Sequence, residues 1–257
     1  MSAPRQRYTG RTVLITGAAA GIGAATAQRL VEEGARVALV DRDAAALQAL
    51  AQGLGEAASC HAADVACAAQ TAQAFADILA RHGRIDAAVL SAGVASARAP
   101  LHRVRVEDFD RVMAVNVRGV FLWLARCMEH MLAQRRGAVA VLSSTSGLRA
   151  TRHMAPYTTS KHAVIGLMKA AALEGADSGV RVNCVNPGPT DTAMMQGINA
   201  ARGALQQVRA QSQAGVPMGR YGTPAELAAL IAFLCSDEAA FCTGATYLAD
   251  GGIMAGT

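Results

Sequence analysis

Short runs of apolar residues recur along the chain, and within each run the apolar positions are continuous rather than alternating with polar ones. The runs lie at residues 13–15, 37–40, 87–90, 138–142 and 180–185. A strand that is buried on both faces has this continuous pattern, whereas a strand with one solvated face alternates. The pattern therefore predicts strands of a sheet that is covered on both sides.

Between these runs lie longer segments with the Ala, Leu, Arg and Glu content of helices. They occupy residues 24–33, 44–54, 69–81, 106–135 and 157–174. Strands separated by helices form right-handed crossovers in a parallel sheet. We therefore predict an α/β fold with a doubly wound parallel sheet and, because no linker or repeat is visible, a single domain over residues 1–257. Residues 187–222 interrupt this rhythm with Gly, Gln, Met and Pro, and we predict a substrate lid around residues 188–220.

Composition and charge narrow the class of protein. The chain has 257 residues, of which 52% are hydrophobic and 17% are charged, as in a globular protein and unlike a disordered one. Its net charge of +5 comes from scattered residues, and aromatic residues make up 4%. A nucleic-acid binder would instead cluster its cations and add aromatic residues for stacking. We therefore expect no nucleic-acid partner.

The cysteines, the histidines and the N-terminal segment argue against a disulfide-stabilised protein, a metalloprotein and a secreted protein. The six cysteines contain no C-x-x-C pair and the six histidines have no ligand spacing, so we expect reduced thiols and no metal site. The N-terminal segment lacks the apolar core of a signal peptide, and no apolar run reaches the ~18 residues of a membrane span. The sequence predicts a cytoplasmic protein without a membrane partner.

A glycine-rich turn follows the first apolar run and leads into the first helical segment. Gly17, Gly21, Ile22 and Gly23 give it the spacing G-x-x-x-G-x-G. Glycines let a backbone approach a pyrophosphate, while the unpaired N–H groups and the dipole of the helix face the anion. The turn predicts a phosphate site, although close packing of the helix would need glycines too.

The second apolar run ends in Asp41, 18 residues after Gly23. An acidic residue at this place accepts hydrogen bonds from an adenosine ribose and repels a 2′-phosphate, which favours NAD over NADP. Two alternatives stay open. Arg42 could accommodate the phosphate of NADP. Asp41 could instead cap the next helix, a role that Asp43 could fill equally well.

A tyrosine and a lysine stand four residues apart, at Tyr157 and Lys161, and thus share one face of a helix. An ammonium ~4 Å from a phenol supplies ~4 kcal/mol at a dielectric constant of ~20, which would lower the pKa of the tyrosine by up to ~3 units. Lysine occurs only at Lys161 and Lys169, so 22 of the 24 basic residues are arginine. Lys161 therefore suggests a need for a compact charge that can bind a ribose, whereas we expect Lys169 to be exposed. The alternative is an ordinary helix with a packed tyrosine and an exposed lysine.

Ser144 follows the apolar run 138–142. The carboxyl ends of the strands line the ligand crevice of a doubly wound sheet, so Ser144 could donate a hydrogen bond to a substrate oxygen. Ser143, Thr145 and Ser146 offer the same group, and the residues alone do not choose among them.

Together these residues resemble the short-chain dehydrogenase/reductase family in its common single-domain form, over nearly the whole chain. The resemblance implies a Rossmann-type sheet, with Ser144 orienting the substrate oxygen and Tyr157 as general acid and base. Lys161 would hold the nicotinamide ribose and lower the pKa of the tyrosine, and Asn116 would support a water in the proton relay. The matching residues are Thr16, Gly17, Gly21, Ile22, Gly23, Asp41, Asp64, Val65, Ala92, Gly93, Asn116, Ser144, Tyr157, Lys161, Asn186, Pro187, Gly188, Thr192 and residues 248–252.

The resemblance also implies the contacts of the cofactor. Asp64 and Val65 would contact adenine, and the backbone after Gly188 together with Thr192 would hold the carboxamide. By themselves, Asp64 would be a plain cap and Asn116 a polar residue inside a helix. The full set expected to bind the cofactor is Gly17, Gly21, Ile22, Gly23, Asp41, Arg42, Asp64, Val65, Ala92, Gly93, Tyr157, Lys161, Pro187, Gly188, Thr190 and Thr192.

One segment departs from the family pattern. The family usually has Asn-Asn-Ala-Gly where this chain has Leu90-Ser91-Ala92-Gly93. A polar contact beside the cofactor is thus replaced, and we expect an effect on local cofactor affinity but not on the catalytic residues.

The predicted reaction is a reversible hydride transfer between NAD(H) and a secondary alcohol or ketone, without a metal. Met194, Met195, Ile198 and Met218 predict an adaptable apolar wall that suits a small, apolar or cyclic substrate. Between the serine and the tyrosine lie Arg149, Arg152 and His153, which either bind a carboxylate or are exposed cations. Relatives that resemble 3-hydroxybutyrate dehydrogenases carry a histidine and a lysine where this chain has Ser146 and Met154, which argues against that substrate.

Two other functions stay open. An NADPH-dependent 3-oxoacyl-carrier-protein reductase resembles this chain and could use Arg135 and Arg136 to dock an acidic carrier, although Asp41 speaks against NADPH. A non-catalytic NAD-binding interaction protein is less consistent with intact Asn116, Ser144, Tyr157 and Lys161. The family resemblance further implies a homotetramer that buries apolar faces of segments 106–135 and 157–174 between subunits.

Overall fold

The computed structural model describes residues 6–200 and 205–256, and in these residues a seven-stranded parallel sheet has the order β3-β2-β1-β4-β5-β6-β7. Each strand pairs with its neighbours in parallel, so the doubly wound α/β fold predicted from the sequence is confirmed. The strands are β1 (Thr12–Thr16), β2 (Arg36–Asp41), β3 (Ala58–Ala62), β4 (Ala87–Leu90), β5 (Gly137–Leu142), β6 (Val180–Pro187) and β7 (Thr246–Ala249).

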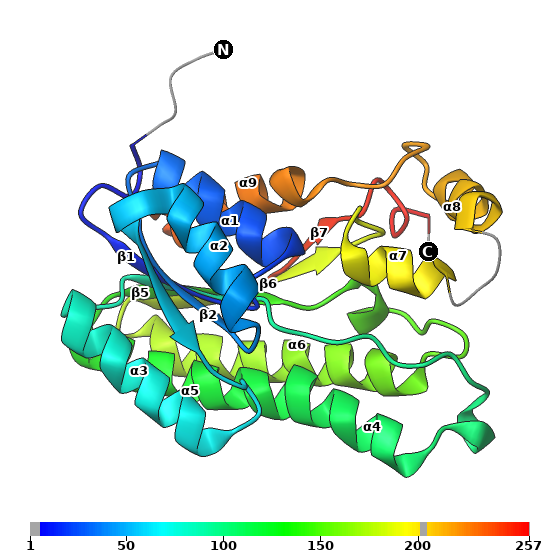
Figure 1. The fold of residues 1–257 in the computed structure, drawn as a ribbon, viewed down its shortest axis with the longest axis horizontal. Coiled ribbons are helices and arrows are strands. Elements are labelled where there is room, and N and C mark those ends of the chain that lie inside the picture. Colours follow the sequence, from blue (N-terminus) through cyan, green and yellow to red (C-terminus); the bar gives the residue numbers. More distant parts are fainter. Residues whose placement is uncertain (1–5, 201–204, 257) are drawn as a thin grey trace.

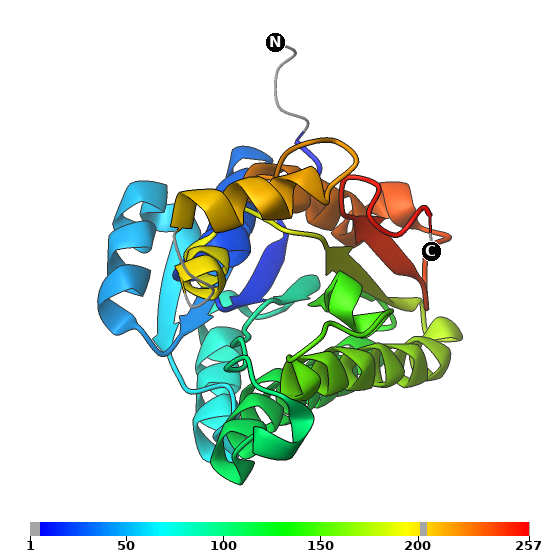
Figure 2. The same ribbon diagram turned by 90° about the vertical axis from the view of Figure 1, so that its right-hand side faces the viewer.

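Helices cover both faces of this sheet (Figure 1). One face carries α1 (Gly21–Glu32), α2 (Ala44–Leu54) and α9 (Pro224–Cys235). The other face carries α3 (Ala68–His82), α4 (Val106–Met113), α5 (Val120–Gln134) and α6 (Ala155–Ala176). Two further helices, α7 (Ala193–Ala200) and α8 (Leu205–Ala214), lie side by side at one end of the molecule (Figure 2).

The continuous apolar runs are explained by two separate cores. Alternate residues of a strand point to opposite faces of the sheet. Val13 and Ile15 of β1 belong to the core under α1 and α9, whereas Leu14 between them belongs to the core that contains Trp123 and Met131 of α5. Every position of a central strand is therefore buried.

The five predicted strands and four of the five predicted helical segments are present, with small shifts at their ends, and the fifth segment, residues 106–135, is divided. The sequence interpretation missed β3, β7 and α9. Both strands are at the edges of the sheet, where fewer positions need to be apolar; β3 reads Ala-Ser-Cys-His-Ala. For α9 the available signal was the capping box of Thr223 and Glu226 with Pro224 at the first turn.

The predicted helix over residues 106–135 is interrupted, which corrects that prediction. A π-helical turn, Ala114–Gly119, separates α4 from α5. Such a wide turn is rare and often occurs at functional sites. Here it contains Asn116, which is fully buried.

The segment predicted as a lid contains α7 and α8 rather than irregular chain, and residues 201–204 of it lie outside the described residues. A parallel bridge joins Thr190 before α7 to Gly222 after α8. The two helices thus form an excursion whose ends meet. Its role as a lid stays a prediction.

Candidate active site

A cavity of about 720 Å³ opens where the strands of the sheet end. Residues that directly follow β1, β4, β5 and β6 line it, because parallel strands have their carboxyl ends at the same edge of the sheet. Asn116 does not line it. The other residues predicted to be catalytic or to bind the cofactor all do: Gly17, Gly21, Ile22, Gly23, Asp41, Arg42, Asp64, Val65, Ala92, Gly93, Ser144, Tyr157, Lys161, Pro187, Gly188, Thr190 and Thr192.

The glycines of the glycine-rich turn allow close backbone packing. The turn also leads into a start of α1 that has no side-chain cap. Gly17 has φ +67°, and a Cβ there would lie 2.7 Å from the backbone nitrogen of Ala92. A Cβ on Gly23 would collide with the carbonyl oxygen of Gly17. Ala20 at the N-cap of α1 offers no side-chain cap, so the first N–H groups of the helix need another partner. Since Gly21 and Gly23 line the cavity, this helix end suits an anion.

Asp41 lies at the end of β2, and its carboxylate is held by the backbone. One oxygen accepts from the N–H of Ala19 at 3.1 Å and the other from the N–H of Asp43 at 3.1 Å. The cap of α2 is Asp43, which accepts from the N–H of Ala46 at 3.0 Å. The alternative of Asp41 as a helix cap is therefore excluded, and its carboxylate joins the glycine-rich turn to the end of β2.

At the end of β3, Asp64 is exposed and accepts from the N–H of Ala66 at 2.9 Å. Arg42 beside Asp41 is exposed as well. Both residues line the cavity at the end where β2 and β3 terminate. Two carboxylates and a guanidinium thus surround this part of the cavity.

The structure distinguishes the hydroxyl groups after β5. Ser143 donates to the carbonyl of Lys161 at 2.9 Å, and Ser146 pairs with Thr151 at 2.8 Å. Ser144 instead accepts from the N–H of Ser146 at 3.1 Å and forms a side-chain hydrogen bond with Tyr157. The amide of Asn186 in β6 donates to the carbonyl of Ser144 at 2.8 Å and positions its backbone. Ser143 and Ser146 are thus engaged in holding the wall together, and Ser144 is the hydroxyl that meets the tyrosine.

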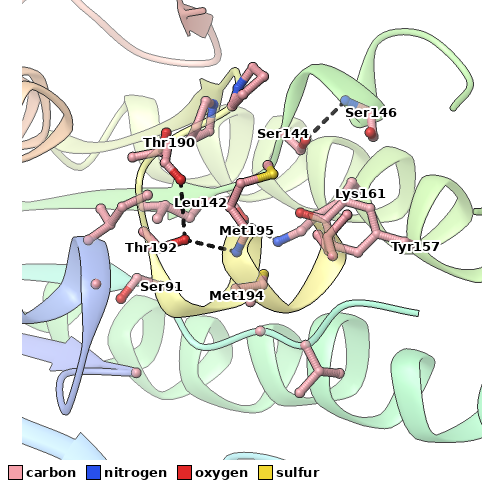
Figure 3. Close-up of a pocket in the computed structure, with 18 of the residues that line it drawn as sticks. Ser91, Leu142, Ser144, Ser146, Tyr157, Lys161, Thr190, Thr192, Met194 and Met195 are labelled. Atoms are coloured by element: carbon pink, nitrogen blue, oxygen red, sulfur yellow. Dashed lines mark hydrogen bonds between the residues drawn. The ribbon is translucent and has the colours of Figure 1, made fainter. Parts of the chain in front are cut away.

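Tyr157 and Lys161 lie on α6 beside Ser144, and Met194 and Met195 of α7 are close by (Figure 3). The Lys161 ammonium lies 5.6 Å from the centre of the Tyr157 ring and donates to the carbonyl of Leu142 at 2.9 Å. Only 5% of Lys161 is exposed, and this burial lowers its pKa to about 8. Lys169 on the same helix is exposed, as predicted.

The predicted fall in the pKa of Tyr157 is not observed. Burial raises the pKa of the phenol above its ordinary value, and the hydrogen bond with Ser144 opposes this only in part. The reason is geometric: the ammonium of Lys161 points to a backbone carbonyl and lies against the ring rather than at the phenol oxygen. The neutral phenol is therefore the stable form of Tyr157 in this structure.

Asn116 lies behind the cavity wall and connects three segments. Its amide oxygen accepts from the N–H of Val94 at 2.8 Å, and its amide nitrogen donates to the carbonyl of Val94 at 3.0 Å. The same nitrogen donates to the hydroxyl of Ser160 at 3.0 Å, and Ser160 donates to the carbonyl of Tyr157 at 2.8 Å. Asn116 is thus no ordinary helix-interior residue, because it ties the segment after β4 to the turn of α6 that carries the tyrosine.

The residues that depart from the family pattern keep β4 joined to β1. Leu90 is buried in a core, with 1% exposed. The Ser91 hydroxyl donates to the carbonyl of Thr16 at 2.5 Å, and the N–H of Ala92 donates to the Thr16 hydroxyl at 3.4 Å. Ser91 thus supplies a polar link at this edge of the cavity with a shorter side chain.

A series of hydrogen bonds between residues close in sequence shapes the segment after β6. The Thr190 hydroxyl donates to the carbonyl of Gly188 at 3.1 Å, and that of Thr192 donates to the carbonyl of Thr190 at 3.4 Å. Thr192 also accepts from the N–H of Met195 at 3.3 Å (Figure 3). A Cβ on Gly188 would lie 2.7 Å from the Cα of Asp250, so the closing segment packs directly against this turn.

The remaining wall differs in part from the prediction. Met194, Met195 and Ile198 line the cavity, but Met218 does not and is 64% exposed. Arg149 lines the cavity, whereas the exposed Arg152 and His153 do not. The sequence pointed to the segments after Gly93 and after Ser144 and to residues 190–218 as lining, but it did not single out the individual residues there, nor Tyr221 and Ile253 beyond them. The lining residues that the structure adds are Val94, Arg98, Thr151, Asn199, Gln211, Ser212, Tyr221 and Ile253.

Over residues 6–200 and 205–256, no helix is long and apolar enough to cross a bilayer. Nor do three or more His, Cys, Asp or Glu side chains of this part of the chain gather in a way that could hold a metal ion.

An uncapped glycine-rich helix end and a Ser-Tyr-Lys group at one cavity of a doubly wound sheet define an α/β oxidoreductase. A family model described as enoyl-(acyl carrier protein) reductase matches residues 17–254. The chain belongs to the short-chain dehydrogenase/reductase family, as the sequence motifs predicted.

Individual relatives cover almost the whole chain. Levodione reductase of Leifsonia aquatica is 34% identical over 98% of this chain and 97% of the relative. A crystal structure of levodione reductase has a TM-score of 0.93 at 34% identity and covers 98% of this chain and 100% of that one. Cis-4-hydroxycyclohexanecarboxylate dehydrogenase of Sinomonas cyclohexanicum is 36% identical over 97% of this chain and 99% of the relative. A 3-ketoacyl-(acyl-carrier-protein) reductase of Brucella melitensis complexed with NADH has a TM-score of 0.88 at 32% identity and covers 95% and 98% of the two chains.

Proposed function

We propose that the chain is an NAD-dependent dehydrogenase that interconverts a small, apolar or cyclic secondary alcohol and its ketone. The observation that carries this proposal is the meeting of Ser144, Tyr157 and Lys161 with the glycine-rich turn at one cavity. A general acid and base, a hydrogen-bond donor for the reacting oxygen and a cation lie together there. The names of the relatives, which act on levodione and on a hydroxycyclohexane carboxylate, support a cyclic substrate.

In alcohol oxidation, Ser144 donates a hydrogen bond to the substrate oxygen and Tyr157, as phenolate, removes the hydroxyl proton. Lys161, whose ammonium lies 5.6 Å from the centre of the Tyr157 ring, would bind a ribose hydroxyl of the cofactor. A nicotinamide dinucleotide bound in this cavity would supply the hydride acceptor for alcohol oxidation and the hydride donor for ketone reduction. Asn116 holds the backbone of Val94 and, through Ser160, the turn of α6 from which Tyr157 projects.

The residues of the cavity fit a nicotinamide dinucleotide. The uncapped first turn of α1 offers N–H groups to a pyrophosphate, and a Cβ on Gly93 would lie 3.4 Å from the amide oxygen of Asn116 and 3.6 Å from the ammonium of Lys161. Glycine at this position leaves room beside the lysine. Asp64 and Val65 are the residues that we assign to adenine, and Thr190 and Thr192 to the carboxamide end.

We assign NAD rather than NADP because the carboxylate of Asp41 is fixed by two backbone N–H groups at the edge of the cavity. A carboxylate in this position binds a ribose diol and repels a 2′-phosphate. Arg42 is exposed and has no comparable fixed position. The NADH complex of the Brucella melitensis reductase is consistent with use of NAD by a relative of this kind.

Titration calorimetry with NADH and NADPH tests this assignment. We expect NADH to bind the wild type at least about tenfold more tightly, because a fixed like charge beside the phosphate of NADPH is costly. Asp41→Ala should narrow this difference, while Asp43→Ala, which removes a nearby carboxylate from the cap of α2, should leave it unchanged. Tighter binding of NADPH by the wild type would reverse the assignment and favour a role for Arg42.

An NADPH-dependent 3-oxoacyl-carrier-protein reductase is the second candidate, and the similarity to the 3-ketoacyl-(acyl-carrier-protein) reductase of Brucella melitensis favours this reaction class. The predicted docking of a carrier at Arg135 and Arg136 does not fit the structure. These residues directly precede β5, whereas Ser144 follows it, so they lie at the opposite end of the strand from the cavity. Arg136 also pairs with Asp237 at 3.2 Å. A carrier would need another surface.

We further propose a homotetramer. Phe109 of α4, Phe121 of α5 and Leu173 of α6 are 39%, 52% and 81% exposed, and large apolar side chains on neighbouring helices favour burial between subunits. Light scattering is expected to give about four times the mass of the chain. Phe121→Glu should shift the mass downward, and a monomeric wild type would contradict the proposal.

A further inference from the structure

Two polar side chains from separate segments meet at the wall of the cavity formed by the excursion between β6 and β7. Asn199 belongs to α7, and Tyr221 follows α8. Both line the cavity, and only 3% of Asn199 and 4% of Tyr221 are exposed. The amide nitrogen of Asn199 donates to the phenol oxygen of Tyr221 at 3.2 Å. No step of the proposed reaction uses this pair.

One polar atom of the pair has no hydrogen-bond partner within the described part of the chain. The amide oxygen of Asn199 is buried and has no hydrogen-bond partner there. Turning the amide over does not help, because a single phenol can satisfy only one end of an amide. A buried acceptor without a partner costs free energy, so such a group points to a donor that arrives with a ligand.

Neighbouring residues hold the pair in place, and apolar residues of α7 lie beside it. Arg209 lies over the ring of Tyr221 at 5.4 Å and pairs with Asp191 at 2.8 Å. Met195 and Ile198 of the same helix α7 line the cavity with apolar atoms. A fixed donor and acceptor beside apolar lining residues recognise one polar group at one position.

We infer that Asn199 and Tyr221 bind a second oxygen of the substrate, apart from the oxygen that reacts at Tyr157. A hydroxyl there would donate to the amide oxygen of Asn199 and accept from the phenol of Tyr221. The inference rests on the proposed alcohol dehydrogenase function and narrows its substrate class. The substrates would be cyclic diols or hydroxyketones, in preference to alcohols with a single oxygen.

The test compares cyclohexanol with the isomers of cyclohexane-1,2-, 1,3- and 1,4-diol, using NAD⁺ and initial rates. For at least one diol, kcat/KM of the wild type should exceed that for cyclohexanol about tenfold or more, since a site built to hydrogen-bond a hydroxyl discriminates against an analogue that lacks it. Asn199→Leu and Tyr221→Phe should remove most of this preference by slowing the diol and not cyclohexanol. Met195→Leu, an apolar change in the same wall, should affect both substrates alike.

Two further measurements distinguish failure of the proposed reaction from failure of the inferred substrate subsite. Asn199→Leu should leave the melting temperature unchanged or raise it, whereas a purely structural role of the pair would lower it. Calorimetry of the diols with the NAD⁺-saturated protein reports binding without turnover. If no probe is oxidised but one diol binds the wild type at least tenfold more tightly than Asn199→Leu, the reaction proposal fails and the subsite stands. If the wild type and Asn199→Leu treat diols and cyclohexanol alike in rate and binding, the inference is overturned.

Discussion

Replacing Tyr157 by phenylalanine is expected to lower kcat for oxidation of a cyclic alcohol by about 10³-fold, because the phenol that shares a hydrogen bond with Ser144 is the group that takes the substrate proton in the proposed reaction. The ring and its packing remain, so the melting temperature should change little and NADH should still bind. Initial rates from the absorbance of NADH, together with calorimetry, measure these effects.

Tyr247→Phe is the matched control for this variant. Tyr247 is a partly buried tyrosine in β7 that does not line the cavity, and loss of its hydroxyl should leave kcat within about twofold. If Tyr157→Phe kept more than a tenth of the wild-type rate, Tyr157 would not be the general acid and base.

The pH dependence of the wild type follows from the same residue. Burial raises the pKa of Tyr157 above its ordinary value of 10.0, so the phenol predominates at neutral pH. Oxidation requires the phenolate, and its rate should therefore rise as the pH increases toward the pKa. Ketone reduction requires the phenol and should stay constant until the pH approaches that value. Tyr157→Phe should lose both the activity and this dependence.

Replacing Lys161 by methionine is expected to abolish activity and to stabilise the fold. The shift of the lysine pKa from 10.5 to about 8 corresponds to roughly 3 kcal/mol that burial of the charge costs the folded state. Methionine fills a similar volume without a charge. It gives up the hydrogen bond to Leu142, which offsets about 1 kcal/mol, so a net gain of about 2 kcal/mol is expected.

The sign of this effect can be checked against pH by urea unfolding. Below about pH 8 the wild-type lysine is charged in both the folded and the unfolded state, and the full cost is present. Between pH 8 and 10.5 the folded state releases its proton first, so wild-type stability rises relative to the variant. The advantage of Lys161→Met should therefore shrink over this range. Lys169→Met, which removes the exposed lysine, should show no gain at pH 7. A less stable Lys161→Met variant would mean that the buried charge is compensated by contacts other than that with Leu142.

The central strands of the fold could be predicted from the sequence because they are buried on both faces. A strand such as β1 contributes to one core through Val13 and Ile15 and to the other through Leu14, which leaves a continuous apolar run. The edge strand β3 need not be apolar at every position. Its polar residues Ser59 and His61 interrupt the apolar run by which the other strands were predicted. The apolar helix α9 shows little periodicity because it is packed on several sides, and only its capping box marks its start.

Many residues of the site could also be predicted from the sequence, since their positions follow from the topology of the sheet. Residues at the ends of parallel strands must meet at one edge of the sheet, and thus Gly17, Asp41, Ser144 and Pro187 all reach the cavity. Tyr157 and Lys161 stand four residues apart, so any helix places them on one face. These conclusions need only the order of the elements and the geometry of each.

Tertiary structure alone decided the properties that depend on burial and on contacts between distant segments. The π-helical turn that buries Asn116 and the choice of Ser144 among neighbouring hydroxyls come from such contacts. So does the rise in the pKa of Tyr157, because the direction of the Lys161 ammonium is set by the carbonyl of Leu142 on β5. Asn199 and Tyr221 carry no local signal and meet only because the segment between β6 and β7 folds back on itself. The sequence thus determined the central strands and helices and which of their ends converge, whereas the edge strands, the hydrogen-bond partners and the charge states of the converging side chains required the packed fold.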